Sequence, residues 1–141
     1  MANDNLRLIH IPANQIDFAW KDGASSLSEA CSEECTIDQL KLVLSRGERE
    51  LIRMDNETGT VGWGVFKIEN YPNIRVLHVT NLVAHGAHFE QFFDSLKTIA
   101  KGQGCSRIRC SAQPAQARLY AMKLGFIPVY MTMEINVLKG E

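Results

Sequence analysis

Three side chains of this sequence have the acid–base chemistry that a group-transfer reaction needs. Glu69 ends one predicted strand, and His78, whose imidazole could act as a base, lies within the next. Tyr120 lies in the last predicted helix and could protonate a leaving group. Each also has a structural interpretation: a solvated strand end for Glu69, a hydrogen-bonded core residue for His78 and a core or rim residue for Tyr120. Glu69, His78 and Tyr120 are the candidate catalytic residues.

The four cysteines are weaker candidates for chemistry. Cys31 and Cys35 are one helical turn apart, whereas zinc sites usually contain more closely spaced cysteine pairs. Cys110, near the end of a predicted strand, would be a nucleophile only if its pKa were lowered. We expect reduced, mostly buried thiols and no metal site.

Length and composition favour one globular domain over residues 1–141. Hydrophobic residues make up 45% of the sequence, and the formal net charge is −1. The sequence has no run of like charges that would indicate nucleic-acid or membrane binding. The amino terminus is polar, with no apolar signal core, and no apolar run is long enough to span a membrane. We expect a cytoplasmic protein.

The hydrophobic periodicity predicts an alternating series of strands and helices. A capping box at Thr36–Gln39 starts the second helix, and Gly23 should fray or break the first. Strands are predicted at 6–11, 50–54, 61–69, 74–83, 106–111 and 126–137. Helices are predicted from about 14 to 31, from 36 to 46, from about 87 to 102, and from 114 to 124.

The three strands between 50 and 83 should form an antiparallel meander. A helical crossover then places the strand at 106–111 parallel to the strand at 74–83, and such crossovers are almost always right-handed. The predicted fold class is α/β, with a mixed, mostly antiparallel sheet and helices on both faces.

Four segments, in this order and spacing, resemble the GCN5-related N-acetyltransferases. They are Thr36–Gly47, Gly59–Val65, Ala100–Cys105 and Leu119–Phe126. The resemblance covers nearly the whole chain and is closest to small, divergent members encoded by bacteriophages. It implies an acetyl-CoA-dependent N-acyltransferase acting on an amine of a small molecule or a protein. The alternative is a catalytically inactive binding module, such as a phage accessory or virion-associated protein.

The resemblance also implies where acetyl-CoA would bind. Its pantetheine arm would lie where the fourth and fifth strands separate, and its pyrophosphate would meet the start of the third helix. The corresponding residues are Leu82, Val83, Ala84, His85, Gly86, Ala87, His88 and Phe89. The family has a Gln/Arg-x-x-Gly-x-Gly/Ala loop here. In this sequence Ala84 replaces the polar residue, Phe89 replaces a small one and Gly86 is one place out of register.

Two interpretations of this loop remain open. Protonated His85 or His88 could offset the phosphate charge, or the segment could be only a helix start with Phe89 as its first core residue. The sequence therefore predicts acetyl-CoA binding that is weak or absent.

The general acid of the family is often a tyrosine four residues before the glycine of a Gly-Phe pair. Here Tyr120 is five residues before Gly125, and Ala121 occupies the family's position. One residue on a helix rotates a side chain by about 100°, so this departure puts the acid role of Tyr120 in doubt. A homodimer through the edge of the last strand is also expected.

Overall fold

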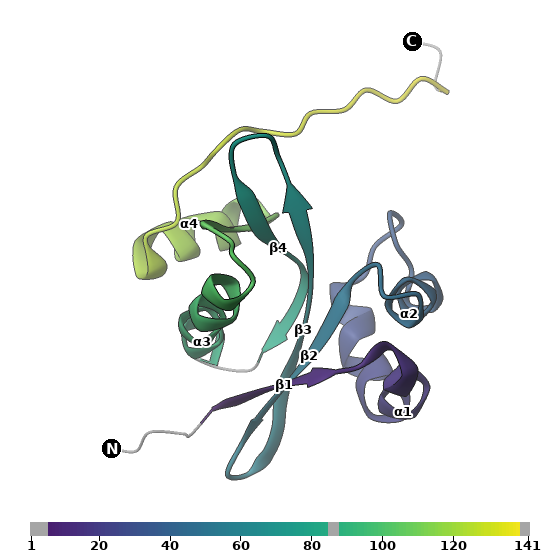
Figure 1. Cartoon of the computed structure of the whole chain (residues 1–141). Helices are drawn as coiled ribbons and strands as arrows, with labels where there is room; N and C mark the ends of the chain where they lie inside the picture. The colour runs from purple at the N-terminus through teal and green to yellow at the C-terminus, as the bar shows by residue number, and fades with distance from the viewer. Residues whose placement is uncertain (1–5, 85–87, 139–141) are drawn as a thin grey trace. The chain divides into compact units, whose positions relative to one another are not determined.

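The computed structural model describes residues 6–84 and 88–138. It contains two compact units, Met1–Ser111 and Ala112–Glu141. Figure 1 shows the elements of each unit. The first unit contains β1 (Arg7–Ile11), α1 (Ile16–Leu27), α2 (Ile37–Ser45), β2 (Glu50–Asn56), β3 (Gly59–Asn70), β4 (Arg75–Ala84), α3 (His88–Gly102) and β5 (Arg107–Cys110). The second contains α4 (Pro114–Leu124).

The first unit is built on one five-stranded sheet in the order β1-β2-β3-β4-β5. The pairs from β1 to β4 are antiparallel, and β5 is parallel to β4. The parallel pair runs from Val76 opposite Arg107 to Val79 opposite Cys110. These pairings confirm the predicted meander and the helical crossover between parallel strands.

Helices cover both faces of this sheet, as predicted. Neighbouring residues of a strand point to opposite faces, and Trp63 and Gly64 of β3 show which helix lies on each. A Cβ added at Gly23 of α1 would lie 3.1 Å from the Trp63 ring, whereas one added at Gly64 would lie 2.9 Å from the Phe92 ring of α3. Figure 1 shows α1 and α2 on one side of the strands and α3 on the other.

The core between the sheet and helices α1 and α2 is apolar and continuous. Its buried members are Ile11, Ile16, Ala19, Trp20, Leu27, Leu40, Leu44, Leu51, Trp63 and Val65. The predicted capping box fixes the start of α2, because Thr36 accepts a hydrogen bond from the Gln39 backbone and the Gln39 side chain accepts one from the Thr36 backbone. Among the described helices, none is long and apolar enough to cross a membrane.

The predicted break at Gly23 is wrong. Helix α1 runs without interruption from Ile16 to Leu27. A larger residue there would crowd the Trp63 ring, because an added Cβ would lie 3.1 Å from it, so close packing favours glycine despite its weak helix propensity.

In the second unit, α4 has the predicted bounds, and Gly125 ends it in a left-handed conformation with φ of 76°. The closing strand predicted at 126–137 is wrong, because residues 126–136 form no helix or strand. Their apolar side chains are exposed, and Ile135 retains 85% of its accessible surface. Apolar residues at every second position predict a strand only where a partner strand completes the backbone hydrogen bonds.

Candidate functional site

The pairing between β4 and β5 ends part of the way along β4, because β5 ends at Cys110. The two strands pair only as far as Val79 and Cys110, whereas β4 continues to Ala84. The edge of β4 from Thr80 to Ala84 is therefore not paired with β5. An extended chain with amide groups can hydrogen-bond to such an edge in the way that a further strand would.

A β-bulge lies at the same point. Val65 of β3 is opposite Asn81, but the next residue, Phe66, is opposite Val79, so Thr80 is the extra residue in β4. Bulges often occur next to active sites, where they redirect a side chain or end a pairing. The bulge at Thr80 and the end of the β4–β5 pair together mark this part of the sheet as the candidate site.

His78 and Glu69, two of the predicted catalytic residues, lie side by side next to this point. His78 is opposite Lys67 across β3 and β4, which places Glu69 diagonally beside it on the same face. His78 Nδ1 lies 3.2 Å from Glu69 Oε2, and both side chains are about four-fifths buried. The contact is short but not aligned as a hydrogen bond, so buried Nδ1 has no well-aligned partner among the described residues.

Two further residues of the same region hold the Glu69 carboxylate. The Tyr71 hydroxyl donates a hydrogen bond of 3.1 Å to Oε1, and Lys67 Nζ lies 3.3 Å from Oε2. Burial raises the pKa of Glu69, but His78, Tyr71 and Lys67 outweigh it, so the pKa lies below its ordinary value. Glu69 is therefore a carboxylate at neutral pH, and its oxygens are oriented by three neighbours.

Ser111 and Arg109 complete the cluster from the other side of β4. Ser111, the first residue after β5, places its Oγ 3.4 Å from His78 Nε2. The Arg109 guanidinium lies 5.4 Å from the centre of the Tyr71 ring. The contact of Ser111 with His78 could not be predicted from the sequence, because it depends on the β4–β5 register. The only sign of this contact in the sequence is that Arg109 and Ser111 are two residues apart, which places them on the same face of an extended chain.

The predicted cofactor-binding residues are only partly described. Leu82, Val83 and Ala84 form the end of β4, beyond the last residue that pairs with β5. His88 begins α3, where its Nδ1 lies 3.1 Å from Gln91 Oε1. Phe89 is half-buried, one position further along α3. His85, Gly86 and Ala87 lie outside the described residues.

Tyr120 belongs to the second unit. Its side chain is partly exposed in α4, and its ring centre lies 5.8 Å from that of Phe126. The role of Tyr120 as a general acid stays a prediction.

Burial makes Cys110 a weak candidate for a nucleophile. Burial raises the pKa of its thiol to about 11, so almost none of it is the reactive thiolate at pH 7. Among the residues described, no three His, Cys, Asp or Glu side chains converge in a way that could hold a metal ion.

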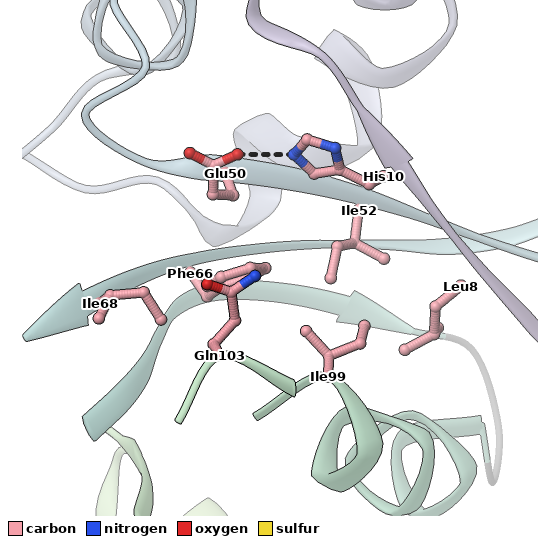
Figure 2. A pocket seen from close by; sticks show the side chains of 8 residues that line it. All are labelled: Leu8, His10, Glu50, Ile52, Phe66, Ile68, Ile99 and Gln103. Atoms are coloured by element: carbon pink, nitrogen blue, oxygen red, sulfur yellow. Dashed lines mark hydrogen bonds and ion pairs between the residues drawn. The ribbon is translucent and has the colours of Figure 1, made fainter. Parts of the chain in front are cut away.

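The opposite face of the sheet contains a cavity of about 600 Å³. Its lining residues are Leu8, His10, Glu50, Ile52, Phe66, Ile68, Ile99 and Gln103. Figure 2 shows that apolar side chains from the sheet and from α3 form most of its wall, with the ion pair of His10 and Glu50 at one side. The cavity lies on the α3 face, whereas Glu69 and His78 lie on the α1 face, so the cavity is separate from the candidate site.

Comparison with known proteins defines the fold. The sequence matches no protein-family model, and no curated protein matches it in sequence. The structure is similar to ribosomal-protein-alanine N-acetyltransferase from Brucella melitensis biovar Abortus 2308, with a TM-score of 0.70, 14% identity, and coverage of 93% of this chain and 98% of that chain.

Two further solved structures show the same likeness. Glucosamine-6-phosphate N-acetyltransferase from Arabidopsis thaliana has a TM-score of 0.64 and 14% identity, and the match covers 94% of this chain and 99% of that chain. An aminoglycoside N-acetyltransferase in complex with CoA has a TM-score of 0.66 and 10% identity, and the match covers 96% of each chain. The chain thus has the fold of the GCN5-related N-acetyltransferases. At these identities the likeness establishes the fold and not the reaction.

Proposed function

We propose that this protein is an acetyl-CoA-dependent N-acyltransferase that acts on an amine. The observation that carries the proposal is the contact between Glu69 and His78, because His78 lies one residue before the last β4 residue that pairs with β5. This pair lies beside a backbone edge that could receive the donor, in a fold that the chain shares with acetyltransferases. The amine acceptor is a small molecule or a protein side chain.

The unpaired edge of β4 fits the extended part of an acyl-CoA. The pantetheine arm contains amide groups, and the backbone from Thr80 to Ala84 offers donors and acceptors that β5 does not use. When bound, acyl-CoA supplies an acyl group activated as a thioester. The predicted phosphate contacts at His85–Phe89 belong to the same proposal.

His78 would accept the proton that the amine must lose to become a nucleophile. The carboxylate of Glu69 lies 3.2 Å from His78 Nδ1, so it stabilises the imidazolium that forms. Tyr71 and Lys67 hold that carboxylate in place. A positioned general base contributes about 10²–10⁴-fold to a rate. Tyr120 remains the proposed donor of a proton to the departing thiolate.

The test compares two histidine–glutamate pairs of the same protein. Free thiol released from acetyl-CoA is followed in the presence of a panel of primary amines, including polyamines, aminoglycosides and lysine peptides. His78→Gln should lower kcat/KM by about 10²–10⁴-fold. His10→Gln is the matched control, because His10 pairs with Glu50 at 2.6 Å on the other face, and it should retain wild-type turnover.

Equal activity of wild type and His78→Gln would show that His78 is not the base. No thiol release with any amine, together with no change in melting temperature at millimolar acetyl-CoA, would contradict the proposal and favour an inactive binding module. A ligand present at about 100 times its dissociation constant stabilises a protein by about 2.7 kcal/mol, so binding of that strength would be visible.

A further inference from the structure

Ser111, His78 and Glu69 form a continuous chain of functional groups. Ser111 Oγ lies 3.4 Å from His78 Nε2, and His78 Nδ1 lies 3.2 Å from Glu69 Oε2. The serine and the carboxylate therefore contact the two different nitrogens of one imidazole. A serine, a histidine and an acid that contact one another in this order occur in enzymes of unrelated folds that use serine as a nucleophile.

The carboxylate determines which nitrogen of His78 can act as a base. A negative charge beside Nδ1 favours the tautomer that carries its proton on that nitrogen. Nε2 is then free of a proton and can accept one from the Ser111 hydroxyl. Tyr71 and Lys67 fix the carboxylate by contacts of 3.1 and 3.3 Å, which makes them positioning residues for His78.

Ser111 is also accessible. Its side chain is exposed, and it directly follows β5 at the point where β4 and β5 separate. The contact of Ser111 with His78 is longer than an ideal hydrogen bond, and the contact of His78 with Glu69 is less well aligned. This is common for catalytic groups, whose hydrogen bonds often tighten only when substrate binds.

We propose that Ser111 is a nucleophile that accepts the acyl group of an activated donor, either a thioester or an aryl ester, before the group passes to the final acceptor. The proposal depends on the proposed function in one respect, since the natural donor would be acyl-CoA. The acylation of Ser111 itself requires only the contacts among Ser111, His78 and Glu69 and an activated acyl compound.

The reaction has two balanced steps. Ser111 Oγ forms a bond to the carbonyl carbon of the donor, and its proton moves to His78 Nε2. The bond from the carbonyl carbon to the leaving sulfur or oxygen breaks, and the leaving group takes that proton. An amine or water then attacks the acyl-serine and gives its proton to His78. Ser111 departs and recovers that proton, and an amide or a carboxylic acid is released.

The test is single-turnover acylation, with p-nitrophenyl acetate and acetyl-CoA used separately and without an amine. The protein is quenched in acid, and intact-mass and peptide measurements locate any added acetyl group. Wild type should gain one acetyl group on the peptide that contains Ser111. Ser111→Ala and His78→Gln should lose that adduct. Ser106→Ala is the matched control, because Ser106 is an exposed serine at the other end of β5, and it should acylate like wild type.

The outcomes separate this inference from the proposed function. An adduct on Ser111 with the aryl ester but not with acetyl-CoA supports the nucleophile and contradicts the CoA-dependent function. Amine acetylation from acetyl-CoA at the wild-type rate in Ser111→Ala, with no adduct in wild type, overturns the nucleophile and leaves the acyltransferase. No adduct on Ser111 with either donor also overturns it, and so does an adduct that persists in Ser111→Ala.

Discussion

Gly64→Ala tests how tightly α3 is packed against the sheet beside the candidate site. A Cβ at this position would lie 2.9 Å from Cζ and 3.0 Å from Cε1 of Phe92. The Phe92 ring is only 1% exposed, and it makes an edge-to-face contact with Phe93 at 5.2 Å. The backbone has little freedom to move away, because β3 is paired on both sides.

Two opposing effects set the size of the change. Overfilling a packed core costs about 1–3 kcal/mol, whereas replacing a strand glycine by alanine returns about 0.5–1 kcal/mol. The expected net loss in the free energy of unfolding is about 1–2 kcal/mol. For a chain of this size that corresponds to a fall in Tm of roughly 3–10 °C.

The assay is urea and thermal unfolding followed by tryptophan fluorescence, since Trp20 and Trp63 are both buried in the first unit. Gly102→Ala is the matched control, because a Cβ at this last residue of α3 would contact nothing within 4 Å. It should leave stability unchanged or raise it by up to about 1 kcal/mol. If Gly64→Ala proved as stable as Gly102→Ala, the packing of α3 on β3 described above would be refuted.

Two further predictions concern protons. Acidification should remove the stability that Glu69 contributes. Folding lowers the pKa of this carboxyl, so its charge stabilises the folded protein above the ordinary pKa. This contribution is lost as the pH falls through the folded pKa. The free energy of unfolding of wild type should therefore fall more between pH 6 and pH 3 than that of Glu69→Gln, and parallel curves would contradict the contacts of Glu69. Because burial raises the pKa of the Cys110 thiol to about 11, from an ordinary value of 9.0, its alkylation by iodoacetamide at pH 7.5 should be roughly 100-fold slower than that of an exposed cysteine. Rapid labelling of Cys110, detected by mass spectrometry, would contradict this effect of burial.

The parts of the fold that follow from local sequence were predictable. Thr36 and Gln39 form the predicted capping box, and Pro114 and Gly125 bound α4 as expected. The parallel β4–β5 pair followed from the helical crossover that connects the two strands. These features depend on a few neighbouring residues or on general chain geometry, so one sequence is enough to find them.

What could not be predicted depends on contacts between distant residues. The packing of Gly23 against Trp63 determines whether α1 is continuous, and nothing near Gly23 in the sequence reveals it. The sequence singled out Glu69 and His78 separately, but only the β3–β4 register with its bulge at Thr80 shows that they touch. The contact between Ser111 and His78 needs the β4–β5 register as well.

Amide hydrogen exchange of β4 with and without CoA tests the central claim most directly. If CoA binds along the edge that β5 leaves unpaired, saturating CoA should slow exchange in the segment from Thr80 to Ala84 and leave β1 unchanged. Adenosine 3′,5′-bisphosphate, which lacks the pantetheine arm, should not protect this segment. Unchanged exchange from Thr80 to Ala84 at millimolar CoA in the folded protein would contradict the acyl-CoA site proposed for this chain.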